Sequence, residues 1–344
     1  MRKDLVLEIK HLKKYFPIEK GFFKKIIGYV KAVDDIDFHI KKGKIFGLVG
    51  ESGSGKSTVA RTVLKAYDQT GGKVFFNSTI DGEIELTALK NREMRKYRRE
   101  MQMIFQDPFS SLNPRMTVKD ILAEPLIVNE IAQGKELEDR VGEVLERVGL
   151  QANYMRRYPH AFSGGQRQRI AIARAIILRP EFIVCDEAVS ALDVSVQAQI
   201  LNLLKDLQKE FNLTYLFIAH DLSVIKHICD EVAVMYVGKI VETALTEELF
   251  NQPKHPYTEA LLSAVPKTDP NLKSNRILLK GEIPDPSKPP SGCYFHPRCR
   301  YSKEICINKQ PKLLNINGSE NKEHFTACHF FDSLDLRGIH VMSS

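Results

Sequence analysis

The clearest chemical signal in the chain is a glycine-rich stretch, residues 50–58, which reads Gly-Glu-Ser-Gly-Ser-Gly-Lys-Ser-Thr. It fits the pattern G-x-x-x-x-G-K-[ST], in which glycines let backbone N–H groups close around a phosphate. In such a loop Lys56 reaches the β- and γ-phosphates of a nucleotide, and the Ser57 hydroxyl binds Mg²⁺. The alternative is a glycine-rich turn with a chance lysine. The predicted nucleotide contacts are Gly50, Ser52, Gly53, Ser54, Gly55, Lys56, Ser57 and Thr58.

A second group of chemical residues follows two apolar runs later in the chain. Residues 182–186 predict a buried strand that ends in Asp186, and a carboxylate there is a ligand that Mg²⁺ prefers. Glu187 comes next, where it is expected to polarise an attacking water as a general base. The other run, 213–219, ends at His220, and the carboxyl end of such a strand lies on the ligand side of an open α/β sheet. By itself, a histidine like His220 is more often structural than catalytic.

A third block lies between these two groups and consists of Ser163, Gly164, Gly165 and Gln166, followed by a helical pattern. Ser163 is a good N-cap, and the glycines expose backbone N–H groups at a helix start, which predicts a second anion site without a lysine. A capped helix with no ligand is the alternative, and the block alone favours it. Residues 190–193, ending in Asp193, open a further helix that is expected to continue to about Glu210.

The elements that must hold these residues indicate an α/β domain. An apolar run at 45–49 predicts a buried parallel strand before the glycine-rich loop, and a helix is expected from about Lys56 to Ala66. From 107 to about 150 the pattern is helical, with interruptions expected at Pro114 and Pro125, so we expect a helical insert between strands.

Other segments carry weaker predictions. Residues 20–31 mix lysines with phenylalanines and isoleucines, which favours a β-hairpin with a solvated face over a surface that contacts a membrane or partner. The remaining expectations are strands at 5–9, 33–40 and 103–105, short strands over 70–90 that turn at Gly71-Gly72 and at Asp81-Gly82, and a helix at about 90–100.

Composition sets the broad class of the protein. With 344 residues, 43% hydrophobic and 27% charged, the chain is long enough for one large domain with an appendage or for two domains. No run approaches the ~20 apolar residues of a membrane span, and no signal-peptide core follows the basic start, so a cytosolic location is expected. The net charge of +7 suits nucleic acid, an anionic membrane or a nucleotide without choosing among them.

Six cysteines divide into two groups. Cys185 and Cys229 lie in apolar segments and are expected in the core, whereas Cys293, Cys299, Cys306 and Cys328 cluster near the C-terminus. That segment, 284–330, has few apolar residues and should need a staple to fold. A reducing cytosol disfavours disulfides, the spacing lacks the close pair usual for zinc (although His296 and His329 are available as substitutes), and four thiolates suit an iron–sulfur cluster. Unligated cysteines remain an alternative.

In combination and order, these blocks resemble the ATP-binding-cassette (ABC) ATPases. The resemblance implies an α/β P-loop NTPase fold, with a RecA-like core, an antiparallel β subdomain and a helical insert at about 107–178. It makes Glu187, His220 and Gln106 the catalytic set and Phe16 the adenine-stacking aromatic, with Tyr15 as an alternative. The remaining motifs it implies are Walker A at 50–58, the signature at 163–166 with Phe162 in place of the usual leucine, Walker B at 182–186 and the D-loop at 190–193.

In this family two cassettes pair head to tail, so that each ATP lies between the Walker A of one chain and the signature of the other. ATP binding then closes the dimer and hydrolysis releases it, which couples phosphate chemistry to a motion. The cofactors implied are ATP and Mg²⁺. Because no motif is degenerate, a regulatory cassette that does not hydrolyse ATP is not favoured.

A narrower resemblance concerns the ATPases of dipeptide and oligopeptide importers, especially the second, F-type subunit. It is carried by the Q-loop at 105–116 and by the segments 234–242 and 255–262, and it extends over about 5–330. It implies a cassette at 5–250, a C-terminal extension at 251–330 with a [4Fe–4S] cluster on the four clustered cysteines (zinc as the alternative), and a loose tail at 331–344.

The same resemblance implies partners and a location. These are a paralogous ATP-binding subunit that completes a heterodimer, two membrane permease subunits, an extracytoplasmic peptide-binding protein and a peripheral position on the cytoplasmic face of the membrane. No nucleic acid is expected. The alternatives are the ATPase of a nickel importer and a soluble ABC ATPase without a transport role, although the second usually carries two cassettes or a long coiled coil and this chain has a single Walker A.

Overall fold

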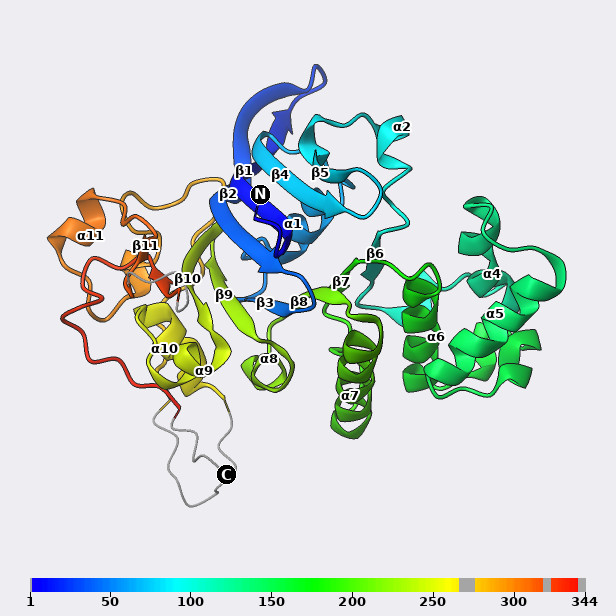
Figure 1. The fold of residues 1–344 in the computed structure, drawn as a ribbon. Coiled ribbons are helices and arrows are strands. Elements are labelled where there is room, and N and C mark those ends of the chain that lie inside the picture. Colours follow the sequence, from blue (N-terminus) through cyan, green and yellow to red (C-terminus); the bar gives the residue numbers. More distant parts are fainter. Residues whose placement is uncertain (1, 266–275, 318–322, 340–344) are drawn as a thin grey trace. The chain divides into compact units, whose positions relative to one another are not determined.

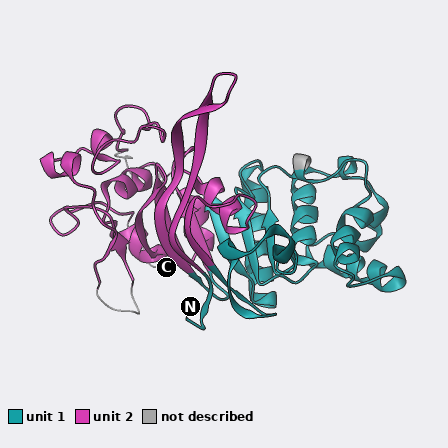
Figure 2. Cartoon of the chain, turned by 90° about the horizontal axis from the view of Figure 1, so that it is seen from above, with its two compact units in different colours: residues 1–7, 40–44, 75–218 teal, residues 8–39, 45–74, 219–344 magenta. Residues whose placement is uncertain are grey.

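The structure is a computed structural model, and it describes residues 2–265, 276–317 and 323–339 (Figure 1). The side chains of Phe109 and Ser110 are outside this description. Figure 2 shows that the chain forms two compact units, each built from several segments. The first unit comprises residues 1–7, 40–44 and 75–218, and the second comprises 8–39, 45–74 and 219–344.

Parallel strands form the centre of the first unit. The strands β6 (Met101–Ile104), β7 (Phe182–Asp186) and β8 (Thr214–Ala219) pair in that order, with Met101 opposite Phe182 and Phe182 opposite Thr214. Every residue of β7 and β8 is buried, as expected for parallel strands covered on both faces. The predicted strands at 182–186 and 213–219 are therefore confirmed.

Helices make up most of the rest of the first unit. They are α3 (Pro108–Ser111), α4 (Val118–Val128), α5 (Gly134–Arg147), η2 (Ala152–Arg156), η3 (Pro159–Ala161), α6 (Gly164–Ile176) and α7 (Val194–Phe211). The expected interruption at Pro125 is wrong, because Pro125 lies inside α4. Burial of Ile121, Leu122 and Leu126 on that helix outweighs the one backbone hydrogen bond that proline removes.

Two predictions between residues 70 and 100 also need correction. Gly71 and Gly72 begin the strand β4 (Gly71–Ser78) instead of forming a turn. Gly72 has a φ of 82°, and a Cβ there would lie 2.1 Å from the His11 carbonyl oxygen, so both backbone conformation and space require glycine. The predicted turn before β5 (Gly82–Glu85) is present, with Ser78 paired to Gly82.

The helix expected at 90–100 is reduced to α2 (Asn91–Met94), which follows η1 (Leu86–Ala88). Lys96 and Tyr97 instead bond to Asp81 in the preceding turn. These side-chain contacts hold the chain after Met94 in turns, so local helical propensity does not decide its conformation.

The second unit contains a long hairpin that continues into the first. Its strands are β1 (Leu5–Lys20) and β2 (Lys25–Lys41), drawn in blue in Figure 1, and they extend well beyond the predicted 5–9 and 33–40. Phe22 and Phe23 in the turn are 97% and 93% exposed, so residues 20–31 form the solvated hairpin that the sequence favours.

Strand β3 (Ile45–Val49), fully buried as predicted, organises the second unit. It runs parallel to β9 (Glu231–Tyr236), with Phe46 opposite Glu231. Antiparallel pairing continues through β10 (Lys239–Leu245), β12 (Phe325–Thr326) and β11 (Leu314–Asn315). The other elements of this unit are α1 (Lys56–Val63), α8 (Leu222–Ile228), α9 (Thr246–Asn251), α10 (Pro256–Ser263), η4 (His296–Arg298) and α11 (Glu304–Asn308).

The C-terminal residues 331–339, expected as part of a loose tail, are anchored within the second unit. The Arg337 N–H donates to Glu259 Oε1 at 3.0 Å, and the Ile339 N–H donates to the Phe250 carbonyl at 2.8 Å. Residues 340–344, which complete the expected tail, lie outside the described residues, as do 266–275 and 318–322 of the expected C-terminal extension.

Candidate functional site

The glycine-rich loop joins β3 to α1 in the second unit, in the strand–loop–helix order that the sequence predicts. Gly50, Gly53 and Gly55 have φ values of 154°, 79° and 108°. A Cβ at Gly50 would lie 2.1 Å from the Met235 carbonyl oxygen, and one at Gly55 would lie 2.1 Å from the Ala32 carbonyl oxygen. Glycine is therefore required at both positions for steric reasons as well as for conformation.

Lys56 is folded back onto the loop that precedes it. Its ammonium group donates to the carbonyl oxygens of Gly50 at 2.8 Å and Glu51 at 2.9 Å, and the side chain is 5% exposed. The hydroxyl of Ser54, a residue that is 2% exposed, lies 3.4 Å from the Lys56 ammonium group. The loop thus holds a buried cation at the N-terminus of α1. The positive charge of Lys56 and the helix N-terminus both favour binding of an anion. The helix ends at Val63, three residues before the predicted Ala66.

The neighbouring aromatic residues of β1 have different surroundings. The Tyr15 hydroxyl donates to Asp34 Oδ1 at 2.5 Å, and Tyr294 and Lys239 also contact this carboxylate. Burial pushes the pKa of Asp34 upward, but these three partners outweigh burial and leave the pKa below its usual value. Tyr15 is therefore committed to a structural network.

Phe16 lies on the other face of β1, as alternation along a strand requires. Its ring contacts that of Tyr67 edge-on at 5.5 Å, and the Lys14 ammonium lies 4.8 Å from the ring centroid. Phe16 is half-buried, as Tyr15 is, but it has no hydroxyl group that could commit it to a polar network. This contrast favours Phe16 over Tyr15 as an adenine-stacking residue.

In the first unit, the predicted acids occupy the end of β7. Asp186 is its last residue and is 5% exposed, and Glu187 follows with a φ of 50°. The Glu187 N–H donates to the Ile218 carbonyl at 3.0 Å, and its carboxylate accepts a hydrogen bond from Gln106 Nε2 at 2.9 Å. The fold therefore brings together Gln106 and Glu187, which belong to separate sequence motifs. A left-handed φ at a non-glycine residue is a strained conformation of the kind that concentrates at functional sites.

The Ser163–Gln166 block forms a capping box at the start of α6, in the first unit. The Ser163 hydroxyl accepts the Gln166 N–H at 3.3 Å, and Gln166 Oε1 accepts the Ser163 N–H at 3.1 Å. This reciprocal pair satisfies two backbone N–H groups and fixes the helix start. A Cβ at Gly165 would lie 2.6 Å from Val196 Cγ1, so glycine lets α6 approach α7 closely.

Asp193 caps α7, which ends at Phe211, close to the predicted end at about Glu210. Its carboxylate accepts hydrogen bonds from the Val196 N–H at 3.0 Å and the Ser195 hydroxyl at 2.8 Å, and these bonds lower the pKa of Asp193. His220, in the second unit, directly follows β8 and is exposed, and Asp221 after it caps α8. The sequence therefore locates both Asp193 and His220 correctly at element boundaries.

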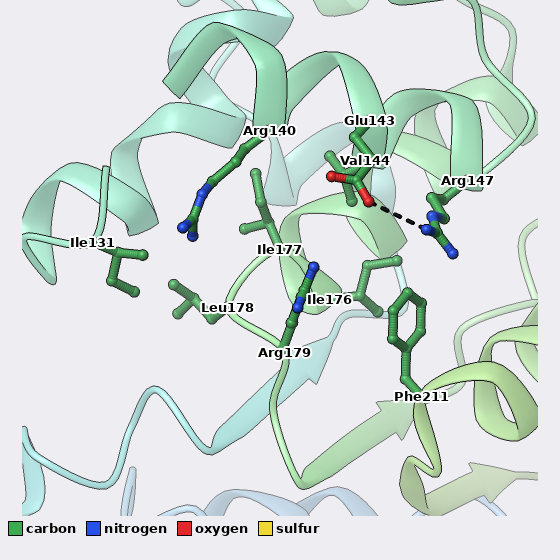
Figure 3. A pocket seen from close by; sticks show the side chains of 10 residues that line it. All are labelled: Ile131, Arg140, Glu143, Val144, Arg147, Ile176, Ile177, Leu178, Arg179 and Phe211. Atoms are coloured by element: carbon green, nitrogen blue, oxygen red, sulfur yellow. Dashed lines mark hydrogen bonds and ion pairs between the residues drawn. The ribbon is translucent and has the colours of Figure 1, made fainter. Parts of the chain in front are cut away.

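A pocket of about 200 Å³ in the first unit contains none of the predicted site residues (Figure 3). Figure 3 shows three arginines around it, Arg140, Arg147 and Arg179. Arg140 pairs with Glu136 and Arg147 with Glu143, so the chain itself neutralises most of this charge. We assign no function to it.

The four C-terminal cysteines meet in the second unit, around a cavity of about 20 Å³ that His296, His329 and Phe295 also line. Burial raises the pKa of Cys299 to about 11 and that of Cys328 to about 12. The donor set, four convergent thiols, has the composition that an iron–sulfur cluster requires. Within residues 2–265, 276–317 and 323–339, no three or more Cys, His, Asp or Glu side chains are arranged as a metal-ion site. Cys185 and Cys229 are buried as expected.

One contact at the phosphate loop has no counterpart in the sequence motifs. Arg298, between two of the clustered cysteines, forms a bidentate ion pair with Glu51, at 2.7 and 3.1 Å. Glu51 occupies a variable position of the loop pattern, and 247 residues separate it from Arg298, so no local signal identifies the pair.

Comparisons with known families agree with this arrangement. Residues 33–190 match the ABC transporter family, and residues 241–306 match the oligopeptide/dipeptide transporter C-terminal region. The oligopeptide transport ATP-binding protein AppF of Bacillus subtilis is 50% identical over 332 residues, which cover 96% of this chain and 98% of AppF. The dipeptide transport ATP-binding protein DppF of Haemophilus influenzae is 50% identical over 304 residues, covering 88% and 90% of the two chains.

Solved structures agree at the level of the fold. The ATP-binding cassette MJ0796, in a dimeric post-hydrolysis state bound to ADP and Pi, superposes with a TM-score of 0.60 at 28% identity. The match covers 70% of this chain and 98% of MJ0796. Among the described residues, no helix combines the length and apolarity needed to cross a membrane. The chain has the ABC ATPase fold and belongs to the family of oligopeptide and dipeptide transport ATP-binding proteins of ABC transporters.

Proposed function

We propose that this chain is the ATP-hydrolysing subunit of an importer of dipeptides and oligopeptides. The geometry of the phosphate loop supports ATP hydrolysis, because the buried Lys56 is the first residue of α1 and its ammonium group lies against the loop. The identity of 50% to transport ATP-binding proteins named for oligopeptides and dipeptides supports the substrate class.

In the second unit, Lys56 and backbone N–H groups of the loop at 50–58, apart from the Glu51 N–H that donates to Tyr257, bind the phosphates. Phe16 stacks on adenine. When ATP enters, Lys56 exchanges its two carbonyl acceptors for phosphate oxygens, which carry more negative charge. The Ser57 hydroxyl is a hard oxygen ligand for Mg²⁺, which neutralises charge on the phosphates when bound. His220 acts from the end of β8 toward the transferred phosphate.

In the first unit, Asp186 supplies a buried carboxylate for Mg²⁺, and Glu187 accepts the proton of the attacking water. Gln106 holds the Glu187 carboxylate through its amide N–H. This bond also ties the base to the segment that begins the helical insert at 107–178, so a movement of that insert reaches the base.

The signature residues Ser163, Gly164, Gly165 and Gln166, with Asp193 of the D-loop, act on the ATP of a paralogous partner subunit. A chain with one lysine loop and a second anion-binding helix start needs such a partner to complete each site. Two membrane permease subunits and an extracytoplasmic peptide-binding protein complete the importer. The chain then works as a peripheral protein on the cytoplasmic face of the membrane.

Cys293, Cys299, Cys306 and Cys328 hold a [4Fe–4S] cluster within a C-terminal extension at 251–330, beside a cassette at 5–250. Convergence of four thiols on one cavity supports this assignment, and zinc is the alternative metal. The four cysteine thiols are the donor type that an iron–sulfur cluster requires. The cluster's role is structural, with a regulatory role as the alternative, because the described residues around the cysteines form only short helices.

The test is reconstitution of the chain with its permease subunits in lipid vesicles. Uptake of labelled di- and oligopeptides that requires ATP, and that stops when Glu187→Gln replaces the wild-type chain, is the expected result. Uptake of Ni²⁺ instead of peptide would favour the nickel importer and overturn the substrate assignment. ATP hydrolysis without stable association with any permease subunit would favour a role outside transport.

A further inference from the structure

The segment that carries the clustered cysteines contacts the phosphate loop directly, within the second unit. Arg298 lies one residue before Cys299, and its guanidinium donates to both carboxylate oxygens of Glu51, at 2.7 and 3.1 Å. The side chain of Arg298 is 7% exposed and that of Glu51 is 27% exposed. A bidentate pair with this much burial is geometrically restrictive, because the planar fork fixes the position of the carboxylate.

Glu51 is held by its backbone as well as by its side chain. Its N–H donates to the Tyr257 hydroxyl at 2.9 Å, and its carbonyl accepts from the Lys56 ammonium at 2.9 Å. One residue of the phosphate loop therefore contacts both the C-terminal segment and the lysine that meets the nucleotide. A displacement of Glu51 changes the position of a Lys56 acceptor directly.

An aromatic cluster fills the space behind this ion pair. Tyr236, Tyr257 and Phe295 are 0–2% exposed, with ring centroids 4.6 to 5.3 Å apart. Phe295 also lines the cysteine cavity, and Arg298 lies 3.4 Å from the Tyr236 hydroxyl. Closely packed rings of this kind transmit displacement instead of absorbing it. The cysteine cavity and the phosphate loop are thus joined by continuous packing.

Removing one partner of the Arg298–Glu51 ion pair should be destabilising. Arg298 Nε is buried without a hydrogen-bond partner, so the Glu51 carboxylate is the main compensation for this guanidinium. A buried charge that loses its partner is strongly destabilising. The folded C-terminal segment therefore favours the conformation of the loop in which Glu51 faces Arg298.

We propose that Arg298 is a positioning residue for the phosphate loop and that the cysteine-bearing segment sets the affinity for ATP through Glu51. This inference rests on the proposed function, in which residues 50–58 bind ATP. Arg298 contacts neither nucleotide nor water in this scheme. Its effect is on the ground-state geometry of Lys56, so it should change ATP affinity more than the turnover of bound ATP.

The experiment compares Arg298→Met, Arg298→Lys, Glu51→Gln and the double variant Arg298→Met/Glu51→Gln as full-length chains. The control is Arg300→Met, which removes a neighbouring arginine of the same segment that pairs with Glu259 and not with the loop. Equilibrium titration with ATP gives Kd, steady-state hydrolysis gives kcat and KM, and thermal unfolding with circular dichroism reports folding.

We expect Arg298→Met to raise Kd and KM for ATP about tenfold, with little change in kcat. Arg298→Lys should lie between wild type and Arg298→Met, because lysine keeps the charge and loses the fork. The double variant should bind ATP no more weakly than Arg298→Met, since both substitutions remove the same Arg298–Glu51 ion pair. Arg300→Met should leave Kd unchanged even where it lowers the unfolding temperature.

An unchanged Kd in both Arg298→Met and Glu51→Gln would overturn the positioning role. Additive increases of Kd in the double variant would overturn it as well. So would a rise in Kd for Arg300→Met equal to that for Arg298→Met. If Arg298→Met does not fold, Glu51→Gln decides the question, because it removes the same pair from the partly exposed side. A wild-type chain that binds no ATP would instead contradict the proposed function, which separates the two failures.

Discussion

Gln106 and Glu187 share a hydrogen bond of 2.9 Å although 81 residues separate them in the chain. Gln106 lies two residues after the end of β6, and Glu187 directly follows Asp186, the last residue of the parallel neighbour β7. Parallel strands bring their carboxyl ends to one edge of a sheet, which is why two distant motifs meet. The contact joins a residue at the start of the helical insert to the proposed base.

Glu187→Gln tests the assignment of the base. The substitution keeps the size and much of the hydrogen bonding of the side chain but removes its ability to accept a proton. We expect kcat for ATP hydrolysis to fall by about 10²- to 10³-fold while ATP binding persists. Hydrolysis and ATP binding should be measured in the complete importer. Turnover at the wild-type rate in that complex would rule out Glu187 as the base.

Lys56→Ala should act on binding instead of on turnover. It removes a buried cation from the phosphate loop, so we expect the Kd for ATP to rise at least about tenfold. Equilibrium titration of the full-length chain provides the measurement. Lys209→Ala, at an exposed position of α7, is the control for loss of a lysine charge. Equal affinity in wild type and Lys56→Ala would contradict the phosphate-binding role.

Met116→Asp tests whether the start of the helical insert receives the permease. Met116 lies between α3 and α4, ten residues after Gln106, and is half-buried. A carboxylate there should weaken an apolar contact, so we expect peptide uptake in vesicles to fall while basal ATP hydrolysis is largely kept. Lys209→Asp is the control. Normal uptake in this and neighbouring surface variants would place the permease contact elsewhere.

Protein purified without oxygen should contain iron and acid-labile sulfide if the cysteine cavity holds the proposed cluster. Cys299→Ser should lose both and reduce the thermal stability of the C-terminal segment, because a thiolate ligand is removed. Metal analysis with visible absorption provides the measurement. One equivalent of zinc without iron in anaerobic protein would contradict the cluster and retain a metal site.

His324 should make stability depend on pH. Its imidazole is fully buried and contacts Glu242 at 2.8 Å and Glu248 at 3.2 Å. Burial lowers the pKa of His324, but the hydrogen bonds and charges of the two glutamates outweigh burial and raise the pKa above its usual value. A group whose pKa rises on folding stabilises the fold fully below its unfolded pKa of about 6.5, and this contribution is lost as pH rises through the folded pKa.

His324→Gln should therefore lower the free energy of unfolding more at pH 6 than at pH 9, by about 2 kcal/mol at the lower pH. Denaturant titration of the full-length chain at both values checks this. His160→Gln, at an exposed histidine, should show no such difference. Equal destabilisation by His324→Gln at the two pH values would mean that the His324 charge does not contribute.

The sequence by itself determined the local features of this protein. The loop at 50–58, the strands at 45–49 and 182–186 and the caps Ser163 and Asp193 follow from glycine positions, apolar runs and capping residues. These signals extend over a few residues, so they can be read without knowing the fold. They misjudged Pro125 and residues 90–100, where packing or side-chain contacts override local preference.

Only the tertiary structure decided which distant residues meet. The Tyr15 hydroxyl donates to Asp34, the four cysteines converge only in the folded chain, and Arg298 reaches Glu51 across 247 residues. Each contact depends on the order in which strands pair and on how elements pack, since a side chain carries no local signal of its distant partner. Motif spacing therefore predicts the chemistry at the phosphate loop, whereas the ion pair that positions this loop is visible only in three dimensions.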